Sequence, residues 1–226
     1  SIYQYANGSW SQLGSSINGE AAGDYSGSSV SLSDDGLTLA IGAYGNDTGG
    51  SNAGHASIFQ YSNGSWSQLG DDIDGIQENE YFGISTDLSE DGTIVAVGGH
   101  GYDYSGEDRG SVSVYQYSDG SWSQLGDEII GEGAGDYSGY SVSLSDDGLT
   151  LAIGAFGNDE NGSNSGHASI FQYSDGSWSQ LGDDIDGDAE DDQFGQSLSL
   201  SADGTTLAVG APYDSYYATD SGSVSI

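Results

Sequence analysis

Four tryptophans place the strongest constraint on this fold, because they stand at equal intervals along a chain of 226 residues. They are 56 residues apart: Trp10, Trp66, Trp122 and Trp178. The sequence around them recurs as well, and residues 20–75 differ from residues 132–187 at only seven positions. A fixed period of this kind is typical of solenoids, propellers and other repeat arrays, in which each unit needs its neighbours to bury its apolar surface.

Each unit contains four short runs in which apolar and polar residues alternate. In the first complete unit these runs are 29–33, 38–43, 55–61 and 65–69. Alternation with period two, carried by β-branched and aromatic residues, predicts strands. No stretch sustains a 3.6-residue period, so we expect essentially no helix.

Turn residues connect these strands in pairs. Asp35-Gly36 lies between the first two runs and Asn63-Gly64 between the last two. Such dipeptides supply the positive φ angles of tight hairpins. Each unit is therefore predicted to be a four-stranded antiparallel meander made of two hairpins.

A single twisted sheet of this size cannot bury both of its faces, but sheets stacked around an axis can. The small residues of 39–43 suit a strand near the axis, whereas Trp66 and Leu69 suit a wider outer position. We therefore predict an all-β fold, a β-propeller of four 56-residue repeats, each a four-stranded antiparallel blade. A β-solenoid or a sandwich is the alternative.

The ends of the chain cut one blade in two. Ser1-Ile2 repeats Ser225-Ile226 in phase, so the cut lies inside the third strand of a unit. The ends can meet and close a ring, complete a blade with a neighbouring copy, or belong to a longer ring, and we expect the first. The predicted units are a half blade at 1–19, blades at 20–75, 76–131 and 132–187, and a half blade at 188–226.

Composition excludes several classes of function. The chain has 36 acidic residues and one basic residue, Arg109, for a formal net charge of −35. Binding to nucleic acid or to an anionic membrane needs clustered cations, so the composition argues against both. There is no cysteine and no apolar run long enough to span a bilayer. Without an initiator Met or a signal peptide, we expect a mature or excised piece of a longer product.

One segment resembles a known repeat. Phe194-Gly195-Gln196-Ser197-Leu198, followed by Leu207-Ala208-Val209-Gly210-Ala211-Pro212, resembles the FG-GAP repeats of integrin-α-type propellers. The other units carry weaker versions of both halves. The resemblance implies propeller blades and a role in extracellular adhesion and ligand recognition. The family's calcium loop does not carry over, because Ser33-Asp34-Asp35-Gly36 is too short to surround an ion.

Two other loops are rich in oxygen ligands and are candidate Ca²⁺ sites, since Ca²⁺ takes six to eight oxygens. The same residue types also build turns, which is the competing explanation. His55 and His167 occupy equivalent positions, but serines replace them in the other units, which argues against a metal role for this pair. The candidate calcium ligands are Asn46, Asp47, Asn52, Asn158, Asp159 and Asn164.

Four asparagines begin N-x-Ser/Thr sequons and are candidate glycosylation sites in a secreted eukaryotic protein. Two of them also serve as hairpin turn residues, which explains them without glycans. They are Asn7, Asn46, Asn63 and Asn161.

No catalytic constellation is recognisable, so we expect no enzyme, and Ca²⁺ is the candidate cofactor. The predicted function is an extracellular or cell-surface structural and adhesive module, a scaffold or filament component. Its predicted partners are other copies of itself, surface or matrix proteins, or glycans, without membrane insertion. The alternatives are a multivalent glycan-binding lectin and a propeller-fold polysaccharide lyase or hydrolase with its site in the second or fourth unit. In the lectin reading, the tyrosines that could stack on sugars are Tyr44, Tyr102, Tyr104, Tyr213, Tyr216 and Tyr217.

Overall fold

A computed structural model describes residues 1–102, 107–216 and 218–226, and every regular element in these ranges is a strand. No helix that could cross a membrane is found there. The strands are the N-terminal hairpin β1 (Tyr3–Ala6) and β2 (Ser9–Gln12); β3 (Ser29–Leu32), β4 (Thr38–Ala43), β5 (His55–Ser62), β6 (Ser65–Gln68) and β7 (Ile73–Asp74); β8 (Ser85–Leu88), β9 (Ile94–Gly99), β10 (Ser111–Ser118), β11 (Ser121–Gln124) and β12 (Ile129–Ile130); β13 (Ser141–Leu144), β14 (Thr150–Ala155), β15 (His167–Ser174), β16 (Ser177–Gln180) and β17 (Ile185–Asp186); and β18 (Ser197–Leu200), β19 (Leu207–Ala211) and β20 (Ser223–Ser225).

Each complete unit forms one antiparallel sheet, as predicted. The first has the order β3-β4-β5-β6, and the two-residue strand β7, which was not predicted, pairs with the start of β5. Asn63 and Gly64 have φ angles of 51° and 87°, which makes the predicted tight turn. The connection at Asp35-Gly36 is longer than a two-residue turn. There only Gly36 has a positive φ, and the Asp35 carboxylate accepts hydrogen bonds from Ser33 and Leu37.

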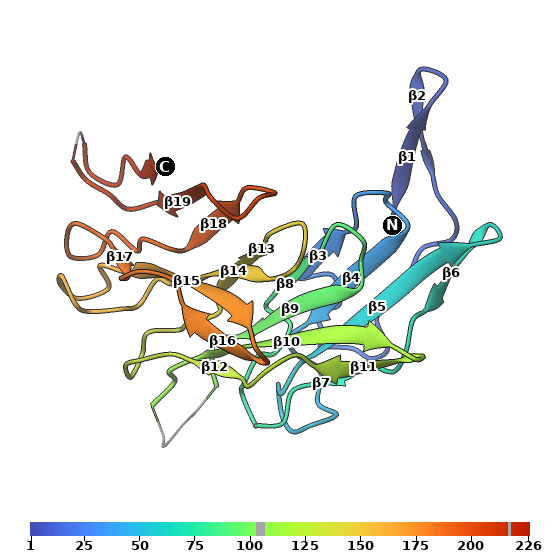
Figure 1. Cartoon of the computed structure of the whole chain (residues 1–226), viewed down its shortest axis with the longest axis horizontal. Helices are drawn as coiled ribbons and strands as arrows, with labels where there is room; N and C mark the ends of the chain where they lie inside the picture. Colours follow the sequence, from blue (N-terminus) through green and yellow to red (C-terminus); the bar gives the residue numbers. More distant parts are fainter. Residues whose placement is uncertain (103–106, 217) are drawn as a thin grey trace.

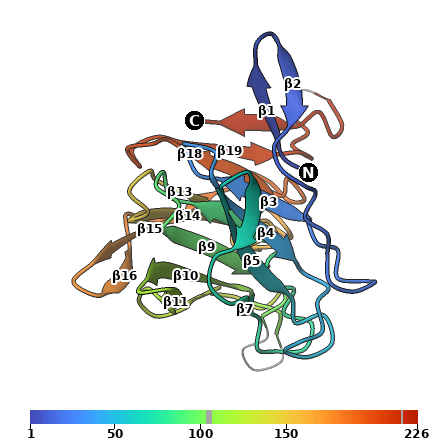
Figure 2. The same cartoon turned by 90° about the vertical axis from the view of Figure 1, so that its right-hand side faces the viewer.

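The sheets follow one another in a ring, the arrangement of a four-bladed β-propeller (Figure 1). Neighbouring sheets meet mainly through their first strands, β3, β8, β13 and β18. These strands therefore lie nearest the axis, and β4, β9 and β14 are the second strands out. Figure 2 shows the stacked sheets from the side. The predicted fold is confirmed.

The core lies between blades. All six residues of β4, β9 and β14 are buried, because each of these strands is covered on both faces. Between the first two blades, Ile58 of β5 packs with Val95 and Val97 of β9. Between the next two, Val114 packs with Leu151 and Ile153. A blade is thus stabilised by its neighbours rather than by its own interior.

The split blade remains open. β1 and β2 pair only with each other, and β18-β19-β20 form a separate three-stranded sheet. The hairpin and the C-terminal sheet lie on opposite sides of the molecule in Figure 1. The expected pairing of the two halves within one chain is therefore not formed in this structure.

Candidate functional site

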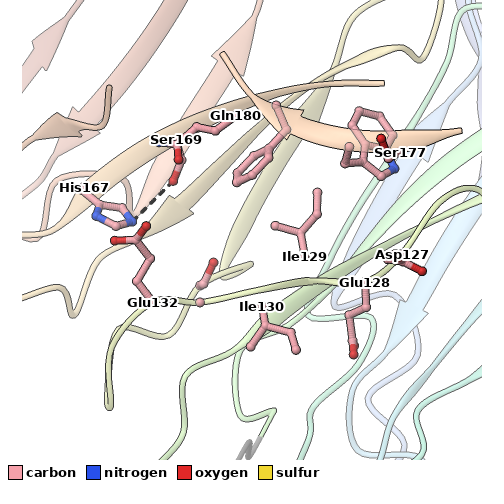
Figure 3. Close-up of a pocket in the computed structure, with 13 residues that line it drawn as sticks. Asp127, Glu128, Ile129, Ile130, Glu132, His167, Ser169, Ser177 and Gln180 are labelled. Carbon is pink, nitrogen blue, oxygen red and sulfur yellow. Dashed lines mark hydrogen bonds between the residues drawn. The ribbon is translucent and has the colours of Figure 1, made fainter. Parts of the chain in front are cut away.

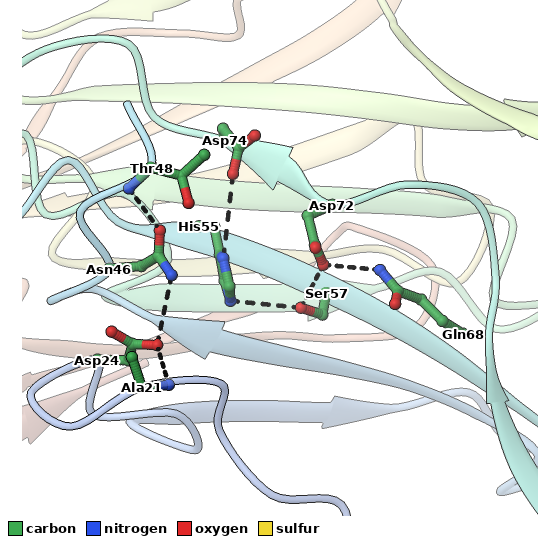
Figure 4. Close-up of polar contacts among 9 residues, drawn as sticks. All are labelled: Ala21, Asp24, Asn46, Thr48, His55, Ser57, Gln68, Asp72 and Asp74. Carbon is green, nitrogen blue, oxygen red and sulfur yellow. Dashed lines mark hydrogen bonds and ion pairs between the residues drawn. The ribbon is translucent and has the colours of Figure 1, made fainter. Parts of the chain in front are cut away.

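A polar cluster surrounds His55 at the start of β5. The β5–β7 register places His55 opposite Asp74, and Ser57 lies two residues further along the same face. His55 Nδ1 is 4.0 Å from Asp74 Oδ1, and His55 Nε2 is 3.4 Å from Ser57 Oγ (Figure 4). The His55 ring is buried, and Asp74 is partly exposed. Burial raises the pKa of Asp74, an effect that the charge of His55 opposes.

Two further carboxylates join this cluster. Ser57 Oγ donates to Asp72 Oδ1 at 2.6 Å, and Gln68 donates to the same oxygen at 2.8 Å (Figure 4). In the described ranges, one group of three metal-ligating side chains is found, and it consists of Glu20, His55 and Asp72, whose ligand atoms all lie within 4.8 Å of one another. An imidazole with two carboxylates is a ligand set that Zn²⁺ and similar divalent metals accept.

The third unit has the same residue types around His167 of β15, but only part of the same contacts. Ser169 Oγ is 3.5 Å from His167 Nε2, and Glu132 points toward the ring (Figure 3). The three residues line a pocket of about 300 Å³. His167 Nδ1, and Oδ1 of Asp186 opposite it in the β15–β17 register, are buried without a hydrogen-bond partner among the residues that the structure describes.

Ser57, His55 and Asp74 also lie in a row in the order of a hydrolytic triad, with the histidine between the serine and the aspartate. The contacts of 3.4 and 4.0 Å are longer than the 2.6–3.2 Å typical of an activated nucleophile. The Ser57 hydroxyl hydrogen is directed to Asp72 rather than to His55. The Ser57 hydroxyl therefore links β5 to the segment before β7.

Sequence reasoning did not find this grouping, although a signal for it exists. The acids that flank the two histidines are the same in the first and third units and differ in the second, where Ile76 replaces Glu20 and Ser111 replaces His55. A residue set that changes together between alternate units indicates shared contacts. The equivalent sets are Glu20, His55, Ser57, Asp72 and Asp74, and Glu132, His167, Ser169, Asp184 and Asp186.

The predicted calcium ligands lie in the loop between β4 and β5 and in the equivalent loop between β14 and β15, and their oxygens stabilise these loops. Asn46 is buried, its Oδ1 accepts the Thr48 amide at 2.8 Å, and its Nδ2 is 3.4 Å from Asp24 (Figure 4). Asp47 Oδ1 accepts the amide of Asn52 at 2.8 Å. The third unit repeats these bonds with Asn158, Asp159 and Asn164. Calcium binding at these six residues remains a prediction.

The four sequons differ in accessibility. Asn7 and Asn63 are exposed at hairpin turns with φ angles of 52° and 51°, and Asn161 is exposed in its loop. Asn46 is only 4% exposed, and its amide nitrogen bonds to Asp24, so the folded chain does not present it to a modifying enzyme.

Aromatic rings form a continuous row across three blades. Tyr25 stacks on Tyr44 with centroids 5.1 Å apart, and Tyr44 meets Tyr81 at 6.1 Å. Tyr81 stacks on His100 at 5.1 Å, and the row continues through Tyr137 to Phe156. Tyr25 is exposed, and the other five rings are half-buried.

The tyrosines predicted to stack on sugars differ in their settings. Tyr44 belongs to this row, Tyr102 is buried, and Tyr213 and Tyr216 are exposed. Tyr104 and Tyr217 lie outside the described residues.

Comparison with known families agrees with this geometry. The FG-GAP repeat model matches residues 18–59, 131–171 and 184–226. The chain belongs to the FG-GAP repeat family. The second unit of this FG-GAP protein is outside the matched ranges, although weaker versions of the signature were expected in all four units. Among curated proteins, no sequence matches the chain.

Solved structures show the same fold at low sequence identity. A Bacteroides uniformis protein assigned as a 6-phosphogluconolactonase aligns with a TM-score of 0.56 and 15% identity, over 87% of this chain and 52% of its own. Sqt1 of Saccharomyces cerevisiae gives 0.52 and 15%, over 85% and 44%. Hydrazine synthase of Kuenenia stuttgartiensis gives 0.50 and 14%, over 82% and 44%. The FG-GAP chain thus spans about half the length of the structures it matches.

Proposed function

We propose that this protein is an extracellular structural and adhesive module without a catalytic role. The observation that carries the proposal is repetition: the first and third blades differ at seven positions and present the same loops and an equivalent histidine–serine contact twice. Repeated surfaces increase avidity without new contacts. Membership of the FG-GAP repeat family supports the adhesive role and the cell-surface location. An active site would instead favour one blade that differs from the rest.

Adhesion of beads coated with the folded chain tests this proposal. Attachment to cell surfaces and to immobilised matrix proteins is measured with and without divalent cations, and beads coated with unfolded chain serve as the control. The variant that carries both Ser57→Ala and Ser169→Ala should adhere as well as the parent, because neither serine acts chemically. Absence of adhesion by folded chain under all conditions refutes the adhesive role. Turnover of a polysaccharide that is lost in this variant refutes the absence of catalysis.

Calcium binding in the two oxygen-rich loops is part of this proposal. The net charge of −35 favours cation uptake, and Asp47 and Asp159 are exposed carboxylates in equivalent positions. Replacing both by Asn keeps an oxygen for the hydrogen bond to the loop amide and removes the charge. Calorimetric titration with Ca²⁺ should lose binding in this double variant and retain it in a control variant, Asp119→Asn, at a hairpin turn. Equal binding by all three proteins refutes the site.

A lectin function is the second candidate, favoured by the aromatic row. The neighbouring rings of this row present the kind of flat apolar surface on which sugar rings stack. Tyr25 is the most exposed ring of the row, at 63%. A glycan array with the parent chain and with Tyr25→Ala tests this reading. Binding that decreases in the variant supports it, and an array without hits refutes it.

A further inference from the structure

The buried imidazole of His55 has acidic side chains near both of its ring nitrogens. Nδ1 lies 4.0 Å from Asp74, and Nε2 lies on the other side of the ring, next to Ser57 and Asp72 (Figure 4). A carboxylate near Nδ1 favours the tautomer that carries its proton there, which leaves the lone pair on Nε2. Ser57 donates its hydroxyl hydrogen to Asp72 and therefore does not donate it to this lone pair. Nε2 is thus available to a cation.

Glu20 completes a group of three ligands. The ligand atoms of Glu20, His55 and Asp72 all lie within 4.8 Å of one another. Two ligands of a tetrahedral Zn²⁺ are about 3.4 Å apart, because each lies about 2.0–2.2 Å from the ion. Binding would therefore draw the ligand atoms together by at most about 1.4 Å. Glu20 is exposed and Asp72 is half-buried, so the two carboxylates rather than the buried ring are the groups that would move.

The three ligands come from three separate segments of the first unit. Glu20 lies in the linker before β3, His55 begins β5, and Asp72 lies in the segment before β7. β7 pairs with β5 through only two pairs of residues. A bound ion would therefore fasten both the linker and the β7 segment to the third strand of the blade.

In the second unit the whole ligand set is replaced, and not the histidine alone. The serine at the histidine position donates directly to the acid at the Asp72 position, from Ser111 to Glu128 at 2.9 Å. The two positions thus adjoin in both units, and the fold accepts either pair. Serine in the second unit therefore does not count against a metal role in the first, because the neighbouring acids change with the histidine. In the order Glu20, His55, Asp72 and Asp74, the replacements are Ile76, Ser111, Glu128 and Ile130.

The third unit keeps the residue types of the first but not the same distances. Glu132 points toward His167 (Figure 3), and Gln180 donates to Asp184 at 2.7 Å, as the equivalent pair of the first unit does at 2.8 Å. Within the part of the chain that the structure describes, only the first unit brings three ligand atoms within 4.8 Å. The third unit is therefore an internal comparison of nearly identical sequence.

We propose that Glu20, His55 and Asp72 bind one divalent transition-metal ion of the zinc type. His55 supplies Nε2 and each acid supplies an oxygen, while Asp74 faces Nδ1 and orients the ring, as carboxylates do behind zinc-bound histidines. Three protein ligands leave one coordination position for water. The imidazole nitrogen favours Zn²⁺ over Ca²⁺ and Mg²⁺, which take oxygen ligands. This site is separate from the oxygen-rich loops and depends on neither adhesion nor calcium binding.

Calorimetric titration with Zn²⁺ tests the proposal. The chain is prepared without a histidine tag, in a buffer with excess Ca²⁺ and Mg²⁺, so that oxygen-only sites on the acidic surface are already occupied. The parent should bind one Zn²⁺. His55→Ser and Glu20→Gln should each weaken binding by more than about tenfold, since even changes behind the ligands cost about 10–100-fold.

The matched control is His167→Ser, which makes the same change in the third unit and should keep the ion. Both histidine variants introduce the residue found at this position in the second unit, and unfolding curves recorded without zinc verify that they fold. A parent chain that binds no Zn²⁺ overturns the proposal. Equal binding by the parent and His55→Ser, or binding lost in His167→Ser and kept in His55→Ser, also overturns it.

NMR of the imidazole rings separates this site from zinc held loosely by surface acids. The chain has three histidines, His55, His100 and His167, so their ring signals can be assigned by substitution. One equivalent of Zn²⁺ should shift the signals of His55 and leave those of His100 unchanged. Glu20→Ile, which introduces the residue of the second unit, should reduce the shift. A titration that moves no ring signal, or moves all three alike, would contradict the assigned ligands.

Discussion

Substitution of Gly98 by Ala measures how closely the blades approach. A Cβ on Gly98 of β9 would lie 2.0 Å from the carbonyl oxygen of Gly139 on the next blade and 2.4 Å from Ser85 Oγ. Ordinary contact begins at 3.4 Å, so the third blade would have to retreat by more than an ångström. Overpacking of this kind costs about 1–3 kcal/mol, and loss of the bond from Ser85 to Gly139 adds about 1 kcal/mol. We therefore expect Gly98→Ala to lower the free energy of unfolding by about 3 kcal/mol and the Tm by about 10 °C.

The next residue of the same strand is the matched control. A Cβ on Gly99 would meet Glu80 Cγ at 3.1 Å, which is tight but adjustable, and alanine stands at this position in the other three units. Alanine also restricts the unfolded chain, which stabilises by about 0.4–1 kcal/mol. Gly99→Ala should therefore stay within about 1 kcal/mol of the parent. Urea and thermal unfolding followed by circular dichroism compare the two variants, and equal losses would refute the proposed close approach between blades.

Three further predictions concern single side chains. Burial raises the pKa of Glu80, so protonation of this carboxyl stabilises the fold below about pH 4.5, and that stabilisation is lost as the pH rises through the raised pKa. Glu80→Gln should therefore reduce the fall in Tm between acidic and neutral pH. A variant whose Tm changes with pH as the parent's does would contradict this prediction. Burial lowers the pKa of His100 from 6.5 to about 4, so its contribution is present above pH 6.5 and lost as the pH falls through 4. His100→Phe, the residue at this position in the third unit, should therefore resist acid unfolding better than the parent, and equal acid midpoints would disprove it. Trp122→Phe removes the 2.7 Å bond to the Leu69 carbonyl and should cost about 1 kcal/mol or more in urea unfolding, whereas an unchanged midpoint would show that the bond does not stabilise the junction.

Local patterns were sufficient to predict the blades. The alternation in residues 29–33 and 38–43 required strands, and Asn63-Gly64 required a turn with two positive φ angles, because these preferences depend on residues that are close in the chain. The short strand β7 escaped prediction because Ile73-Asp74 forms it only by pairing with β5, a contact that two residues cannot indicate alone.

The period of 56 residues, the strand pattern and the turn residues determined by themselves that this chain forms repeated antiparallel sheets. Each of these features acts through neighbouring residues or through simple repetition. Only the tertiary structure decided that Glu20, His55 and Asp72 meet, because they come from the linker before β3, from β5 and from the segment before β7. It also decided that the split blade stays open. Whether two complementary edges meet depends on the curvature accumulated over every blade between them, and no single segment of sequence encodes that curvature.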